Sequence, residues 1–214
     1  MRGAWKTLSL LILTICSFIY ADVFMTELTD PQNSSDAGRY VELHNNGDAV
    51  VDLSSGWSIQ RWTNGNVDPQ SPVALTGAIT PGGFYIICND ADKFAATYGG
   101  TCDLDIGTGG AADSNGDDNI ALLGSDGSIV DMFGVPGEDG TGTDHDFEDG
   151  RAGRNRQVGA PNATWNVEEW SVGSNSHDAP DGFNPGAWAG NTPETTGTDV
   201  MFTVTDETES YTNI

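Results

Sequence analysis

Short apolar segments, interrupted at close intervals by glycine, asparagine and aspartate, constrain the fold of this chain more than any other feature. In one such segment Val41 and Leu43 share one face and Tyr40 and Glu42 share the other, before an Asn/Gly/Asp turn begins. Repeated short segments bounded by turn residues are typical of strands. We therefore predict an all-β fold, with strands over 23–29, 39–45, 56–62, 72–75, 84–89, 119–124 and 128–133.

One short helix is expected among these strands, over residues 90–98. Asp90 can cap its first turn, Phe94 and Tyr98 lie four residues apart on one face, and Gly99 can end it. Two further segments are rich in glycine and aspartate. We expect them to be long acidic loops without regular structure, over 103–118 and 134–153.

The N-terminus has the pattern of a secretory signal peptide. Arg2 and Lys6 precede a mostly apolar stretch over 8–20, which is short for a membrane span. We predict a signal peptide over residues 1–21, a secreted, extracellular product, and no membrane insertion after cleavage. The alternative is an uncleaved anchor.

The remaining chain divides by composition. We predict a sandwich domain over 22–190, whose C-terminal part wraps around it and docks Trp165, Trp170 and Trp188. A linker-like stretch follows over 191–199, and a tail over 200–214. The apolar run 200–205 in this tail either starts a further β-domain, pairs with the first domain, or frays.

The formal net charge is −24, and both basic residues of the predicted leader are lost on cleavage. Such a surface repels nucleic-acid phosphate and anionic lipid, so we expect neither as a partner. It attracts divalent cations, but solubility in a saline medium explains it equally well.

The cysteines fit export to an oxidising compartment. Cys16 lies in the predicted leader, which leaves Cys88 and Cys102 to form a disulfide around the helix. The alternative is two buried free thiols. The spacing of the two cysteines matches neither a zinc site nor a redox motif. Two sequons, at Asn33 and Asn162, are candidate glycosylation sites in a eukaryotic host.

Two acidic segments are candidates for metal or catalytic chemistry. Alternating oxygen ligands make Asp113, Asn115, Asp117 and Asp118 candidates for calcium, although a simple turn explains them too. His145 lies between two aspartates and could act as a general base, but no nucleophile motif accompanies it. We expect no required cofactor, with calcium as the alternative.

Two groups of side chains are candidates for ligand binding. Arg151, Arg154 and Arg156 could bind a phosphate, sulfate or uronate, or could pair with nearby acids. Trp62 adjoins a polar loop and is the best candidate for stacking on a sugar ring.

Several short motifs resemble the lamin-tail domain family in order and spacing. They are Thr26-Glu27-Leu28, the strand 40–45, Val51-Asp52-Leu53-Ser54 before Gly56-Trp57, Pro81-Gly82-Gly83, and Gly116-Asp117-Asp118. The resemblance covers residues 23–133 and implies an immunoglobulin-like β-sandwich of lamin-tail type. The doubled Ser54-Ser55 departs from the family pattern.

A second resemblance reaches further along the chain. Asp131 to Gly137, Asp144-His145, the three arginines, Glu169-Trp170 and Asp181-Gly182-Phe183 resemble the version of this domain that heads secreted bacterial nucleases. There it is an accessory module, and a separate domain performs the chemistry.

These observations together predict a secreted, non-catalytic interaction or accessory module. Its partner would be an extracellular polymer or protein. The alternatives are the front fragment of an exported nuclease or hydrolase, and a carbohydrate-binding module.

Overall fold

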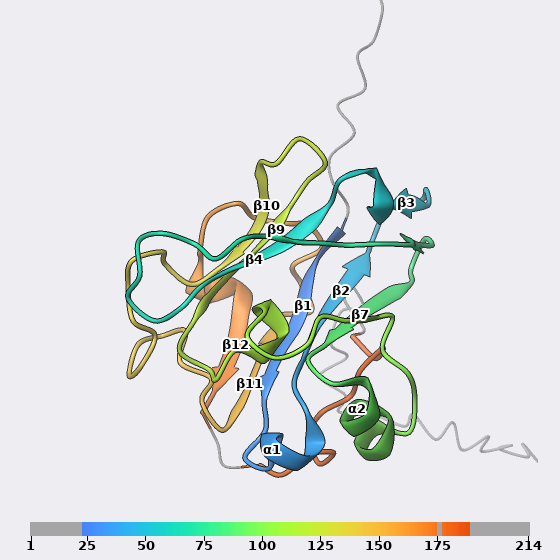
Figure 1. Ribbon diagram of the computed structural model, residues 1–214. Helices are drawn as coiled ribbons and strands as arrows, with labels where there is room; N and C mark the ends of the chain where they lie inside the picture. The colour runs from blue at the N-terminus through green and yellow to red at the C-terminus, as the bar shows by residue number, and fades with distance from the viewer. Residues whose placement is uncertain (1–22, 175–176, 189–214) are drawn as a thin grey trace, which may run out of the picture.

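The computed structural model describes residues 23–174 and 177–188. The predicted leader, linker and tail, at 1–21, 191–199 and 200–214, lie outside the described residues. Within those residues strands are the main regular structure, which confirms the predicted all-β class (Figure 1).

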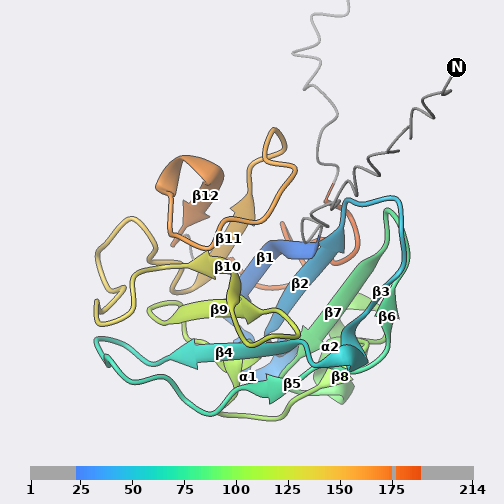
Figure 2. The same cartoon turned by 90° about the horizontal axis from the view of Figure 1, so that it is seen from above.

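Two sheets face each other in the described part of the chain, and together they form an immunoglobulin-like β-sandwich (Figure 2). The six-stranded sheet has the order β12-β11-β1-β2-β7-β8, and the four-stranded sheet has the order β10-β9-β4-β5. The first consists of Trp170–Gly173, Gly150–Arg154, Val23–Asp30, Tyr40–Asn45, Phe84–Cys88 and Leu104–Asp105. The second consists of Ile129–Phe133, Asn119–Leu123, Ser58–Trp62 and Val73–Ala74. A separate pair joins β3 (Val51–Asp52) to β6 (Ala78–Ile79).

The main core lies between these two sheets. Leu43 and Ile87 of the six-stranded sheet and Ile59, Leu122 and Phe133 of the four-stranded sheet belong to one buried cluster, each with 0% exposure. Full burial of side chains of this size contributes roughly 1.5–3 kcal/mol each. This core holds the six-stranded sheet against the four-stranded sheet and leaves its other face to contact further segments of the chain.

The outer face of the six-stranded sheet is also covered, so β1 and β2 are buried along their whole length. The α-helix α2 (Ala91–Tyr98) covers one part, where Phe94 packs edge-on against Tyr40. The segment 177–188 covers another, where Trp188 packs against Phe24. Simple alternation of buried and exposed residues therefore fails on these two strands.

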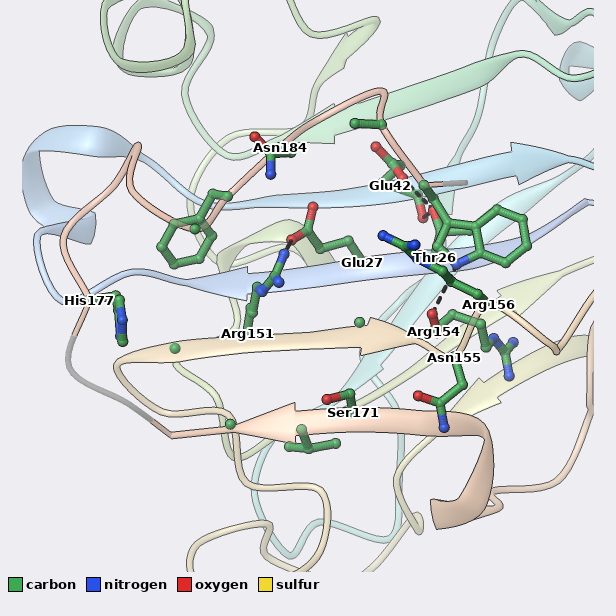
Figure 3. A pocket seen from close by; sticks show the side chains of 18 of the residues that line it. Thr26, Glu27, Glu42, Arg151, Arg154, Asn155, Arg156, Ser171, His177 and Asn184 are labelled. Atoms are coloured by element: carbon green, nitrogen blue, oxygen red, sulfur yellow. Dashed lines mark hydrogen bonds and ion pairs between the residues drawn. The ribbon is translucent and has the colours of Figure 1, made fainter. Parts of the chain in front are cut away.

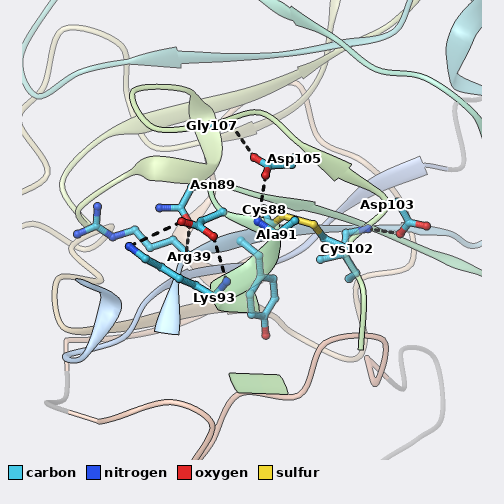
Figure 4. The surroundings of a disulfide bond; sticks show 12 residues. Arg39, Cys88, Asn89, Ala91, Lys93, Cys102, Asp103, Asp105 and Gly107 are labelled. Carbon is cyan, nitrogen blue, oxygen red and sulfur yellow. Dashed lines mark hydrogen bonds and ion pairs between the residues drawn. A yellow bond between two sulfur atoms is a disulfide. The ribbon is translucent and has the colours of Figure 1, made fainter. Parts of the chain in front are cut away.

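A disulfide joins Cys88, at the end of β7, to Cys102, beyond the end of α2 (Figure 4). The predicted bridge is thus confirmed, and so is the helix that it encloses. Asp90 caps α2 by accepting a 3.0 Å hydrogen bond from the Lys93 backbone N–H, and Gly99 ends it with φ of +75°. The bridge fastens both ends of the helix segment to the sheet.

Seven predicted strands correspond to β1, β2, β4, β5, β7, β9 and β10 with shifts of up to two residues at their ends. The expectation of a single helix is wrong, because a second short helix, α1 (Ser34–Ala37), precedes β2. The described part of the chain also contains three 3₁₀ turns, at Leu53–Ser55, Ala111–Asp113 and Val167–Glu169.

The prediction that 134–153 is wholly irregular is wrong at its end, where β11 begins. The sequence Gly150–Arg154 has little intrinsic strand preference. It becomes a strand because it pairs with β1 on one side and with β12 on the other. The segment 103–118, also predicted to be irregular, contains the short strand β8, which pairs in parallel with β7.

Candidate functional site

A polar pocket of about 720 Å³ opens on the outer face of the six-stranded sheet (Figure 3). Its floor comes from β1, β2, β11 and β12, and its wall comes from the segment 177–188. The volume lies within the usual range for small-ligand sites, roughly 300–1,000 Å³. We call it the outer-face pocket.

Four residues of the floor lie in one row across four strands. Glu27 of β1 is the register partner of Glu42 on β2 and of Gly153 on β11. Gly153 is in turn the partner of Ser171 on β12. Register partners project from the same face of a sheet, so the row runs Glu42, Glu27, Gly153, Ser171.

The carboxylate of Glu27 is held from two sides. The Tyr40 hydroxyl donates a hydrogen bond of 2.6 Å to Oε2, and the Arg151 guanidinium donates one of 2.8 Å to Oε1. Burial raises the pKa of Glu27 above its usual value, and these two contacts act against that rise. Glu27 is therefore a fixed, paired acceptor on the pocket floor.

Glu42 connects the floor to the wall. The Thr26 hydroxyl donates to its Oε1 at 2.6 Å, and the Gly186 backbone N–H donates to its Oε2. Burial raises the pKa of Glu42 to about 7, and the neighbouring Glu27 charge adds to the rise. Near neutral pH this carboxyl group exchanges a proton while it holds the segment 177–188.

The wall is fastened at two further points. The Asn33 side chain donates to the Ala179 carbonyl at 3.1 Å and accepts from the Ala179 backbone N–H at 2.8 Å. The Trp188 indole N–H donates to the Arg154 carbonyl at 2.9 Å. These contacts place the wall of the pocket without a regular element.

The three candidate arginines separate into different roles. Arg154 is fully buried, forms ion pairs with Asp131 and Glu169, and donates to the Met25 carbonyl at 3.2 Å. Of the two alternatives for Arg154, the structure shows the pairing with nearby acids, and its buried guanidinium has no access to an external anion. All three arginines line the pocket, Arg154 without an exposed side chain. Arg156 forms no ion pair within the described residues, 23–174 and 177–188.

The prediction that Trp62 offers a face to a sugar ring is also wrong. Its ring is only 7% exposed and packs with Ala121, Leu123 and Met132 on the outer side of the four-stranded sheet. The adjoining polar loop suggested exposure, but the neighbouring strands cover the ring.

The calcium candidates belong to two different networks. Asp113 accepts hydrogen bonds from Arg39 and Asn89, whereas Asp118 pairs with Arg61 at 3.2 Å. Asn115 is exposed. Asp117 accepts from the Asn64 side chain, and burial together with the Asp118 charge raises its pKa. Among the described residues, no cluster of three or more His, Cys, Asp or Glu side chains could hold a metal ion.

His145 is buried within an aromatic cluster, not solvated in a loop. The Thr143 hydroxyl donates to the Gly140 carbonyl at 2.7 Å, so it must accept from the His145 Nδ1, 2.9 Å away. Burial lowers the pKa of His145. A neutral ring beside Phe133 and Trp165 stabilises the loop and has no substrate access.

Both sequon asparagines use their side-chain amides internally. Asn162 donates to Glu169 at 2.7 Å and accepts from the Thr164 backbone N–H at 3.0 Å. Asn33 binds the segment 177–188, as described above. Glycan attachment at either position stays a prediction.

Apart from Arg151, sequence reasoning missed the residues that form the pocket floor. The sequence patterns assign no role to Glu27, Glu42 or Ser171, and they predict that Gly153 lies in a loop. The sequence shows Glu27 and Glu42 only as glutamates within two successive strand motifs. The strand register is needed to place them side by side on one face.

The architecture defines an immunoglobulin-like β-sandwich with a polar pocket on one outer face. The model of the Lamin Tail Domain family matches residues 19–137, which is more than half of the chain. The chain therefore belongs to the Lamin Tail Domain family. No curated protein matched it. The pocket takes β1 and β2 from the matched region, but β11, β12 and the wall from residues beyond it.

Within the described residues, no helix is long and apolar enough to cross a membrane.

Proposed function

We propose that this chain is a non-catalytic interaction module that works outside the cell, and that the outer-face pocket is where it meets its partner. The family is an immunoglobulin-like domain family, which is compatible with such a role. The observation that carries the proposal is the pocket itself. Its floor lies on a rigid sheet, and its carboxylates are already positioned by hydrogen bonds.

Two further observations support an extracellular setting. The Cys88–Cys102 disulfide fits an oxidising compartment. The net charge of −24 disfavours nucleic acid as a partner and favours solubility in a saline medium. The partner is accordingly an extracellular polymer or protein.

The test uses the full chain expressed in a secreting host. We expect the protein in the medium with its disulfide formed, retained on at least one member of a panel of extracellular polysaccharides and matrix proteins. Retention inside the cell, or binding to none of the panel, would contradict the proposal. Nuclease or glycoside hydrolase activity of the purified chain would favour the alternative of an exported hydrolase.

A further inference from the structure

We propose that the outer-face pocket is a binding site for a neutral saccharide. This inference rests on the proposed function and names the ligand class of the same site.

Gly153 leaves open space above the pocket floor. A Cβ built at this position meets no atom within 4 Å, although the residue lies in the middle of a paired strand between Glu27 and Ser171. The backbone there needs no glycine, since no positive φ occurs at this position. Glycine in a strand interior weakens the strand and often marks a place where a ligand approaches the backbone.

Most charges around the pocket are paired or are offset by an opposite charge. The exception is Glu42, whose carboxyl group accepts hydrogen bonds from Thr26 and Gly186 and whose pKa burial raises to about 7. On the floor, Arg151 neutralises Glu27 through a 2.8 Å ion pair. Arg154 is paired with Asp131 and Glu169. At the rim, Arg156 and Asp181 carry opposite charges and are both exposed. With the Arg156 and Asp181 charges offsetting each other, the lining attracts a charged ligand only weakly, whereas an uncharged polar ligand needs no counter-charge.

The polar groups match the hydrogen-bonding needs of hydroxyl groups. A carboxylate oxygen accepts more than one hydrogen bond, so Glu27 retains lone pairs beyond its contacts with Tyr40 and Arg151. The Arg151 side chain is 48% exposed and keeps further N–H donors. Figure 3 shows Glu27 and Arg151 meeting at the centre of the pocket, with Ser171 and Asn184 on opposite sides.

Hydroxyl groups both donate and accept, and a sugar presents several on adjacent carbons. A paired carboxylate and guanidinium side by side offer an acceptor and a donor at neighbouring positions, which suits two adjacent hydroxyls. An acidic sugar is less suitable, because Arg154 is buried, Arg151 is paired with Glu27, and Asp181 offsets the charge of Arg156 at the rim.

The test measures binding of the full chain to cello-, manno- and xylo-oligosaccharides by calorimetry and to the corresponding polymers by affinity electrophoresis. The two arms separate a free oligosaccharide from a polymer as the source. Gly153→Val adds a side chain into the open space and should weaken binding at least about tenfold, while β-branching suits its strand. Ser171→Val fills the neighbouring position and should act in the same direction.

Gly100→Val is the matched control, because Gly100 also has no atom within 4 Å of a built Cβ and lies outside the pocket. We expect it to bind as the unmodified chain does. Melting temperatures identify any variant that fails to fold. Equal binding by folded Gly153→Val and Ser171→Val proteins would overturn the inference.

Two outcomes distinguish this inference from the proposed function. Binding only to polygalacturonate, a sulfated polysaccharide or a matrix protein would overturn the neutral saccharide and leave the interaction module intact. Binding to nothing in either panel would overturn both.

Discussion

Glu27 and Glu42 lie directly opposite each other on the neighbouring antiparallel strands β1 and β2, and both are at least 95% buried at exposures of 5% and 1%. Like charges in this arrangement oppose each other. Arg151 and Tyr40 stabilise the first carboxylate, whereas the second receives only a hydroxyl and one backbone N–H. Burial therefore raises the pKa of both carboxyl groups, but only Glu27 has an ion-pair partner that acts against the rise.

The raised pKa of Glu42 predicts that the stability of the fold depends on pH. Because the pKa of Glu42 rises to about 7 on folding from its ordinary value of 4.5, the folded state binds this proton more tightly than the unfolded state does. The contribution is complete below pH 4.5 and is lost as pH rises toward 7. Its upper size is roughly 3 kcal/mol.

Glu42→Gln should remove this slope. We expect the free energy of unfolding, measured by denaturant titration at pH 5 and pH 8, to differ less between the two conditions in this variant than in the unmodified chain. Glu168→Gln, at an exposed site, serves as the control and should leave the difference unchanged. An equal slope in all three proteins would refute the assignment.

Arg154→Met should destabilise the fold strongly. The substitution leaves the Asp131 carboxylate buried with only the backbone N–H groups of Met25 and Asn162 as donors. Breaking one partner of a buried ion pair costs about 3–5 kcal/mol. Arg156→Met, on the exposed rim, should change the free energy of unfolding by less than about 0.5 kcal/mol. Similar losses in both variants, measured by denaturant titration, would show that Arg154 is not a structural anchor.

Replacing both Cys88 and Cys102 by alanine should lower stability by about 3 kcal/mol, the loss expected for a bridge that closes a loop of this length. The two cysteines are 14 residues apart. Thermal unfolding with and without dithiothreitol measures the effect. The reductant should destabilise the unmodified chain and leave the alanine variant unchanged; a response of the variant would place the effect elsewhere.

Gly134→Ala should destabilise more than glycine geometry alone explains. A Cβ at this position would lie 2.2 Å from Asn119 Oδ1, in a residue whose φ is +82°. Gly127→Ala is the matched control, since its φ is +79° and no atom lies within 4 Å. We expect the Gly134 variant to lose about 1–3 kcal/mol more than the control, because the clash adds to the common backbone strain. Equal melting temperatures of the Gly134→Ala and Gly127→Ala variants would mean that the loop at Gly134 shifts to accommodate the added methyl group.

The strands of the core could be predicted from the sequence because their patterns are local. β9 and β10, for example, are joined by a glycine turn whose Gly127 has a positive φ, as a tight hairpin requires. β11 could not be predicted, since its glycines and arginines become a strand only through pairing with β1 and β12. A local sequence pattern does not indicate which distant strand a segment will pair with.

The pocket escaped prediction for the same reason. Glu27 and Ser171 are separated by most of the chain, and only the sheet register brings them into one row. The polar loop beside Trp62 predicts an exposed ring, although Leu123 and Met132 cover it. Arg154 and Arg156 look alike in the sequence, yet one is a buried anchor and the other is exposed.

The segment 177–188 forms one wall of the pocket and is attached through a few hydrogen bonds and the docked Trp188. Segments held by few contacts open at a lower free energy than the core that carries them. A ligand that touches both floor and wall would stabilise the closed arrangement by linkage. Protection of this segment from proteolysis or hydrogen exchange would then report occupancy of the pocket directly, without a labelled ligand.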